Sequence, residues 1–187
     1  MVHHSFQWIQ GALGIITALG MTRLITSAVH MHLARRKIKL DWVPFVWALN
    51  IFFLLLQFSW VFVALESIVA EWAFGLFLML LCFVLTLFVA AALVLPNTDG
   101  QAGQSLQTWF QEDGRWSLPF LGLYAFLGYP FNWYFGGQTP ETNPASAILM
   151  LMAAIAFFTK SRKVLATVTI ADLLLTGGIV LEMILVA

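Results

Sequence analysis

The sequence has few charged residues, which make up only 10% of its 187 positions. Soluble domains carry about 25% charged and about 45–50% apolar residues, whereas 61% of this chain is hydrophobic. Nine Lys and Arg residues balance nine Asp and Glu residues, so the chain also lacks the basic excess that is typical of nucleic-acid binding. These shortages exclude a soluble, disordered or ordinary nucleic-acid-binding protein.

Cysteine and the common catalytic motifs are scarce as well. The single cysteine, Cys82, excludes a disulfide within the chain and a zinc or iron–sulfur site built from cysteines of one chain. The sequence has no Walker A, Gly-x-Ser-x-Gly or His-Glu-x-x-His motif and no potassium-filter loop. It also has no deep lysine for a retinal Schiff base and no facing histidines for haem. We therefore predict no cofactor and no metal, and we favour a protein that is not an enzyme.

Long apolar segments are what the chain has instead, and its mean hydropathy is +0.89. A helix needs about 20 apolar residues to cross about 30 Å of hydrocarbon. Runs such as 51–56 and 74–84 do not alternate between polar and apolar residues, which favours helices over a barrel. We predict a single all-α domain over residues 1–187, a polytopic helical bundle in the membrane. Its six transmembrane helices are expected over residues 6–31, 42–65, 72–95, 117–135, 144–158 and 164–186.

The basic residues predict how this bundle is oriented. They gather after the first and the fifth apolar segments: Arg35, Arg36, Lys37, Lys39, Lys160, Arg162 and Lys163. Six crossings bring both groups to one side, which the positive-inside rule makes cytoplasmic. Both termini are then non-cytoplasmic. These basic side chains are expected to contact lipid headgroups or a protein partner. The layout resembles that of small bacterial membrane proteins, which predicts the bacterial inner (plasma) membrane.

The connection between the third and fourth apolar segments has a helical pattern of its own. Leu106, Trp109 and Phe110 recur at helical spacing among glutamines. This predicts a short helix lying on the cytoplasmic interface, with a plain polar loop as the alternative. Further on, Pro130 is expected to end or kink its helix near Tyr129.

Three polar residues fall inside the predicted crossings, where ionisable groups are energetically costly and functional by default. Arg23, Asn50 and Asp172 each lie eight residues from the cytoplasmic boundary of their segments, at a depth of about 12 Å. We predict that they form one polar layer, in which Arg23 and Asp172 make an ion pair. The alternative is that the layer only fixes the register of the helices.

Further polar residues share helical faces with this layer. Ser27 follows Arg23 by four residues, and Gln57 follows Asn50 by seven. Thr169 and Thr176 flank Asp172 at three- and four-residue steps. We include all of them in a predicted ion or proton pathway: Arg23, Ser27, Asn50, Gln57, Thr169, Asp172 and Thr176.

Two acidic residues, Glu66 and Glu182, lie near the non-cytoplasmic ends of their segments and are predicted to form an outer mouth. The alternative is that they are solvated residues at the level of the lipid headgroups. Small residues at helical spacing, such as Gly11, Gly14 and Ala18, permit close helix contact and favour a homo-oligomer. The lipid bilayer and a small ion or solute are the other expected partners.

The leading functional hypothesis is a small membrane channel or transporter for an ion or a proton. One alternative is a non-transporting sensor or scaffold subunit that docks a partner through the basic cytoplasmic loops. A lipid-handling membrane enzyme is a second alternative, although the sequence has no recognisable catalytic constellation.

Overall fold

The computed structural model describes residues 2–36, 38–69, 73–96, 105–137, 139, 141 and 144–186. Regular structure within these ranges is entirely helical, so the all-α prediction is confirmed. The helices are α1 (Val2–Leu33), α2 (Trp42–Ile68), α3 (Phe74–Val94), α4 (Leu106–Glu112), α5 (Ser117–Gly136), α6 (Ala145–Phe158) and α7 (Arg162–Val186), with 3-10 turns η1 (Ala34–Arg36) and η3 (Gly114–Trp116). Each predicted segment contains a helix, and the boundaries agree to within about one helical turn.

Within the described ranges, four helical stretches are long and apolar enough to cross a membrane, as an integral membrane protein requires. They are Trp8–Arg36, Trp42–Val61, Phe74–Val94 and Arg162–Leu185. The 14-residue α6 is apolar but shorter. The sequence also predicted crossings at α5 and α6, which are not among these four.

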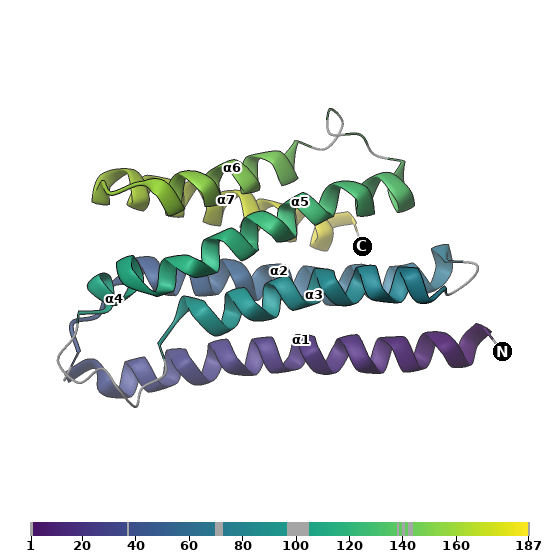
Figure 1. Ribbon diagram of the computed structural model, residues 1–187, viewed down its shortest axis with the longest axis horizontal. Helices are drawn as coiled ribbons and strands as arrows, with labels where there is room; N and C mark the ends of the chain where they lie inside the picture. Colours follow the sequence, from purple (N-terminus) through teal and green to yellow (C-terminus); the bar gives the residue numbers. More distant parts are fainter. Residues whose placement is uncertain are drawn as a thin grey trace.

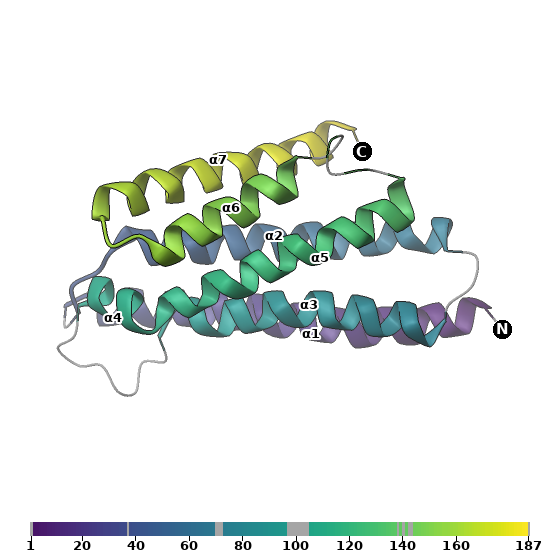
Figure 2. The same ribbon diagram turned by 45° about the horizontal axis from the view of Figure 1, so that its top comes forward.

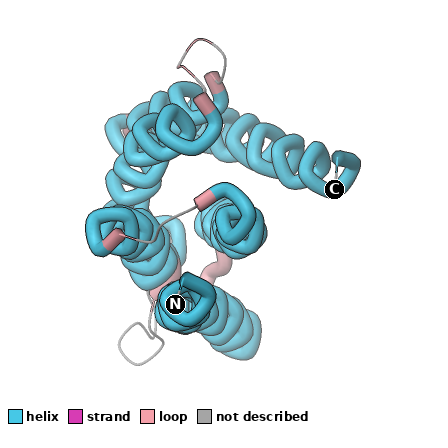
Figure 3. The backbone as a smooth tube through the Cα atoms, turned by 90° about the vertical axis from the view of Figure 1, so that its right-hand side faces the viewer, coloured by secondary structure: helices cyan, strands magenta, loops and turns pink. Residues whose placement is uncertain are grey.

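The six longer helices run side by side along the long axis of the molecule (Figure 1; Figure 2). Short α4 lies at one end, together with the α1–α2 and α6–α7 connections, and we call this the basic end because Arg35, Arg36, Lys160 and Lys163 belong to it. The opposite end is called the distal end. Seen along the long axis, α1 and the end of α7 lie on different sides of the bundle (Figure 3).

The helix contacts follow a closed order. Helix α2 packs against α3, α3 against α5, α5 against α6, α6 against α7, and α7 against α2 again. Helix α1 packs on the outside of this five-helix ring, against α2 and α3. Helix α2 therefore lies between α1 and α7.

The local sequence explains where helix α2 begins and where helix α5 ends. The Asp41 carboxylate accepts the Val43 N–H at 3.1 Å and caps α2. Helix α5 ends at Gly137, whose φ of 59° is the left-handed conformation that glycine adopts without strain. Of the two effects expected of Pro130, an end of the helix is wrong, because α5 continues through it to Gly136. A kink at this position stays a prediction.

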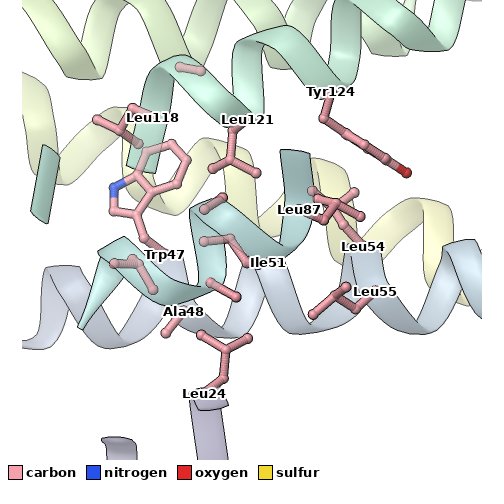
Figure 4. Packing of buried hydrophobic residues seen from close by; sticks show 14 of the residues in the cluster. Leu24, Trp47, Ala48, Ile51, Leu54, Leu55, Leu87, Leu118, Leu121 and Tyr124 are labelled. Carbon is pink, nitrogen blue, oxygen red and sulfur yellow. The ribbon is translucent and has the colours of Figure 1, made fainter. Parts of the chain in front are cut away.

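The ring is held by an apolar core between α2, α3 and α5 (Figure 4). Trp47, Ile51 and Leu87 are fully buried there, beside Leu118 and Leu121 of α5. Burying one large apolar side chain contributes about 1.5–3 kcal/mol where water is the alternative. In a membrane, close packing and hydrogen bonds contribute more to helix association.

The predicted helix between the third and fourth segments is present as α4. It turns Leu106, Trp109 and Phe110 into the protein, where all three are buried. Its first residue, Leu106, donates its backbone N–H to the Lys39 carbonyl at 3.1 Å, which ties α4 to the α1–α2 connection. The plain polar loop is therefore excluded, while the position of α4 at a membrane surface stays a prediction.

Candidate functional site

A salt bridge at the basic end sets the register between α2 and α7. Arg162 Nη2 lies 2.5 Å from Asp41 Oδ1, and the guanidinium also lies over the Trp42 ring. Both helices start at the basic end and run in the same direction. Asn50 comes nine residues after Asp41, and Asp172 comes ten after Arg162. At 1.5 Å per residue, the two side chains reach nearly equal heights, about 14 Å beyond the salt bridge.

Asn50 and Asp172 meet at this height. Asn50 Nδ2 donates to Asp172 Oδ2 at 2.6 Å, and the two residues are 0% and 2% exposed. Of the three residues predicted to form one polar layer, Asn50 and Asp172 thus meet in a hydrogen bond between α2 and α7. A buried amide–carboxyl contact of this kind restrains both side chains and leaves each with further hydrogen-bonding capacity.

The remaining oxygen atoms around this pair lack protein partners. Asn50 Oδ1, Asp172 Oδ1 and Thr176 Oγ1 are buried without a hydrogen bond, whereas Thr169 Oγ1 donates to the Leu165 carbonyl at 2.7 Å. Most buried polar atoms in folded proteins are satisfied. Three unsatisfied oxygens on facing sides of α2 and α7 therefore mark this layer as the strongest candidate for a functional site.

The predicted ion pair between Arg23 and Asp172 is wrong. Arg23 instead donates to the Ser27 hydroxyl and to the Ala92 and Leu95 carbonyls, at 3.4 and 3.3 Å. These carbonyls lie at the C-terminal end of α3, where the helix dipole attracts a cation. Arg23 and Ser27 therefore belong to the α1–α3 contact and not to the Asn50–Asp172 layer.

The physical reason is the order of the helices. Counting residues along a segment gives the height of a side chain, but it does not give the neighbours of its helix. Because α2 lies between α1 and α7, the Arg23 guanidinium faces α3 while Asp172 faces α2. The equal heights of Arg23 and Asp172 therefore did not show that their side chains form an ion pair.

The α1–α3 contact gives a first prediction, for Arg23→Met. The variant should lower the free energy of unfolding by about 1–2 kcal/mol, because charge-assisted hydrogen bonds between membrane helices contribute about this much. Reversible unfolding in mixed micelles, followed by circular dichroism, measures the change. Arg35→Met is the matched control, because Arg35 is exposed and, among the described residues, bonds to the nearby His32 carbonyl alone. Equal stability of the two variants would contradict the capping role of Arg23.

A cavity of about 250 Å³ lies inside the ring toward the distal end. All five ring helices line it, and the predicted pathway residue Gln57 and outer-mouth residue Glu182 are both on its wall. Leu54 and Ile179 form the part of the wall that is nearest in sequence to Asn50 and Thr176. Lys37 and the side chain of Glu66, which the sequence also singled out, lie outside the described residues.

A second cavity, of about 300 Å³, opens at the basic end. Its wall includes Arg115 and Lys160 together with Arg162 and Leu165, which are both on α7. Leu165, Thr169, Asp172, Thr176 and Ile179 follow one another at three- and four-residue steps and share one face of α7. This α7 stripe connects the wall of one cavity to the wall of the other, and the Asn50–Asp172 pair lies between them.

Known proteins give no family for the chain. No family model matches it, and no curated protein and no solved structure matches it either. The function must therefore be inferred from the Asn50–Asp172 pair and from the two cavities beside it.

The predicted headgroup or partner contacts are mostly exposed at the basic end. The exposed ones are Arg35, Arg36, Lys39, Lys160 and Lys163, while Arg162 is partly buried in its salt bridge. Five exposed cations at one end suit anionic lipid headgroups. Their role as a contact surface stays a prediction.

Several residues of the site escaped sequence analysis, among them Asp41 and most of the residues that line the distal cavity. Asp41 precedes α2 at a predicted segment boundary, where an N-cap was a recognisable signal, but its bridge to α7 is a tertiary contact. Tyr124 and Asn132 line the distal cavity from α5. Helical periodicity could not predict that these two residues line a cavity, because the cavity forms only where five helices meet.

Proposed function

We propose that the protein is a small membrane transporter that moves a proton or a small cation past Asn50 and Asp172. One observation supports this most directly. The Asp172 carboxyl group is 2% exposed, uses one oxygen to bind Asn50, and has no hydrogen-bonding partner on the other. It lies on a helix face that leads to a cavity in each direction.

The charge of Asp172 supports the choice of cargo. A charged side chain inside a membrane costs several kcal/mol unless it is paired, and no Lys or Arg in the described ranges bonds to Asp172. A proton or a bound cation is the remaining way to neutralise it. The buried carboxyl, amide and hydroxyl oxygens of Asp172, Asn50 and Thr176 form the type of donor set that hard cations prefer.

The closed packing of this layer favours a transporter over an open channel. Asn50, Thr169 and Thr176 are all fully buried, so neither cavity extends through the layer. Cargo that reaches Asp172 from one cavity must leave after α7 shifts against α2. The hydrogen bond between Asn50 and Asp172 is the contact that such a shift would break and remake.

The same proposal includes the membrane topology. Helices α5 and α6 complete six crossings, the basic end is cytoplasmic, and both termini are non-cytoplasmic, as the distribution of Lys and Arg predicts. The bacterial plasma membrane is the proposed location. Helix α5 can cross the membrane despite Pro130, because α3 and α6 pack against it. Neighbouring helices can satisfy the backbone groups that a proline frees.

Flux through the purified protein tests the proposal. The chain is reconstituted into liposomes containing a pH-sensitive dye, and a potassium diffusion potential drives cations inward. We expect acidification well above that of protein-free liposomes if the cargo is a proton. Uptake of radioactive sodium in place of acidification would identify a metal cation. Rates equal to those of protein-free liposomes for both cargoes would contradict the proposed function.

A further inference from the structure

We infer that the distal cavity binds a small organic ammonium ion, which makes it the substrate site of the transporter. The claim that the ammonium ion is a substrate rests on the proposed function. The claim that it binds depends only on the residues that line the cavity. The evidence is the combination of a carboxylate, uncharged hydrogen-bonding groups and stacked aromatic rings on the wall of one cavity of about 250 Å³.

The aromatic part of the wall is ordered by ring stacking. Phe83 stacks on Tyr124 with centroids 4.4 Å apart and on Phe131 at 5.5 Å, and all three residues line the cavity. Phe58 adds a fourth ring, with its centroid 5.7 Å from that of Phe83. Aromatic faces attract cations through their quadrupoles, and the faces that stacking leaves uncovered are the ones available to a ligand in the cavity.

The polar part of the wall selects for positive charge. Glu182 is the only charged residue among the described residues that line this cavity, and no lysine or arginine lies on that wall. Gln57, Asn132 and Ser146 add uncharged groups that can accept hydrogen bonds from a ligand. An organic cation is attracted by Glu182 and by the rings, whereas an anion of the same shape is repelled by Glu182.

The size of the cavity limits the ligand. A cavity of about 150 Å³ holds benzene, so about 250 Å³ has room for one ring or a comparable apolar body with a short cationic group. Leu54 and Ile179 line the cavity on the side of the Asn50–Asp172 layer, about one helical turn from Asn50 and about two turns from Asp172. The ammonium site and the Asp172 site are therefore adjacent but separate.

Three probes that share an aromatic ring and differ in charge test the inference: benzyltrimethylammonium, benzyl alcohol and benzoate. Calorimetric titration of the full chain in nanodiscs should show saturable binding of the ammonium ion, at least tenfold weaker binding of the alcohol, and no binding of benzoate. Glu182→Gln should weaken ammonium binding about tenfold, which corresponds to about 1.4 kcal/mol. Glu182→Asp, which keeps the charge, should stay within about threefold of the unchanged protein.

Glu141→Gln is the matched control, because Glu141 is an exposed acidic residue that does not line the cavity. Equal binding of the ammonium ion and the alcohol, equal effects of Glu182→Gln and Glu141→Gln, or no saturable binding would each overturn the inference. Liposome flux separates this failure from that of the proposed function. Proton or sodium flux without ammonium binding would contradict only the ammonium site, and ammonium binding without flux would contradict only transport.

Discussion

Asp172→Asn is expected to reduce proton or cation flux by at least about 100-fold, the lower range of what a positioned proton-transfer group contributes. The amide has nearly the same shape as the carboxyl group, and it can still form one hydrogen bond with Asn50. It cannot release a proton, however, and it carries no charge to bind a cation. The fold should therefore survive while the proposed carrier group is lost.

Liposome flux, normalised to the amount of inserted protein, measures this effect. Asp113→Asn is the matched control, because Asp113 is an exposed aspartate at the basic end, away from the Asn50–Asp172 layer. Arg23→Met should also retain flux, since Arg23 bonds to Ser27 and to α3 rather than to Asp172. Unchanged flux in Asp172→Asn would remove Asp172 from the mechanism.

The sequence predicted those features of the structure that depend on one helix at a time. The apolar segments and their ends predicted where the helices lie, because a membrane helix must satisfy its backbone internally and must have a minimum length. Helical spacing placed Thr169 and Thr176 on the face of Asp172, and depth placed Asn50 at the height of Asp172. Each of these inferences needs only the geometry of one helix and the boundary of one segment.

Relations between helices were not predictable in the same way. The sequence offered Arg23 as the one deep cation and Asp172 as the one deep anion, yet α2 lies between their helices. Pairing by charge ignored the carbonyls at the end of α3, which are also acceptors for a guanidinium. The bridge between Asp41 and Arg162 was missed for the related reason that Arg162 was assigned to lipid headgroups or a protein partner and not to another helix of the chain.

The same Asn50–Asp172 contact could serve packing or transport, and stability separates the two roles. Asn50→Leu is expected to lower the free energy of unfolding by about 2 kcal/mol. Hydrogen bonds between membrane helices average about 0.6 kcal/mol, with a maximum near 1.7. Asn50 exceeds that average because its loss leaves both Asp172 oxygens buried without a partner. Unfolding in mixed micelles measures the loss, and Leu49→Ala, at an exposed position of the same helix, is the control.

The double variant Asn50→Leu/Asp172→Leu should recover stability to within about 1 kcal/mol of the unchanged protein. Replacing both partners of a buried polar contact by apolar groups is often neutral or stabilising, because neither is left unsatisfied. Flux in this stable variant should nevertheless be absent. A recovered fold with full flux would contradict the proposed function, and a double variant less stable than Asn50→Leu would contradict the energetic argument. Recovered stability without flux would mean that a membrane protein keeps three unsatisfied oxygens between two of its helices, α2 and α7, for the sake of transport.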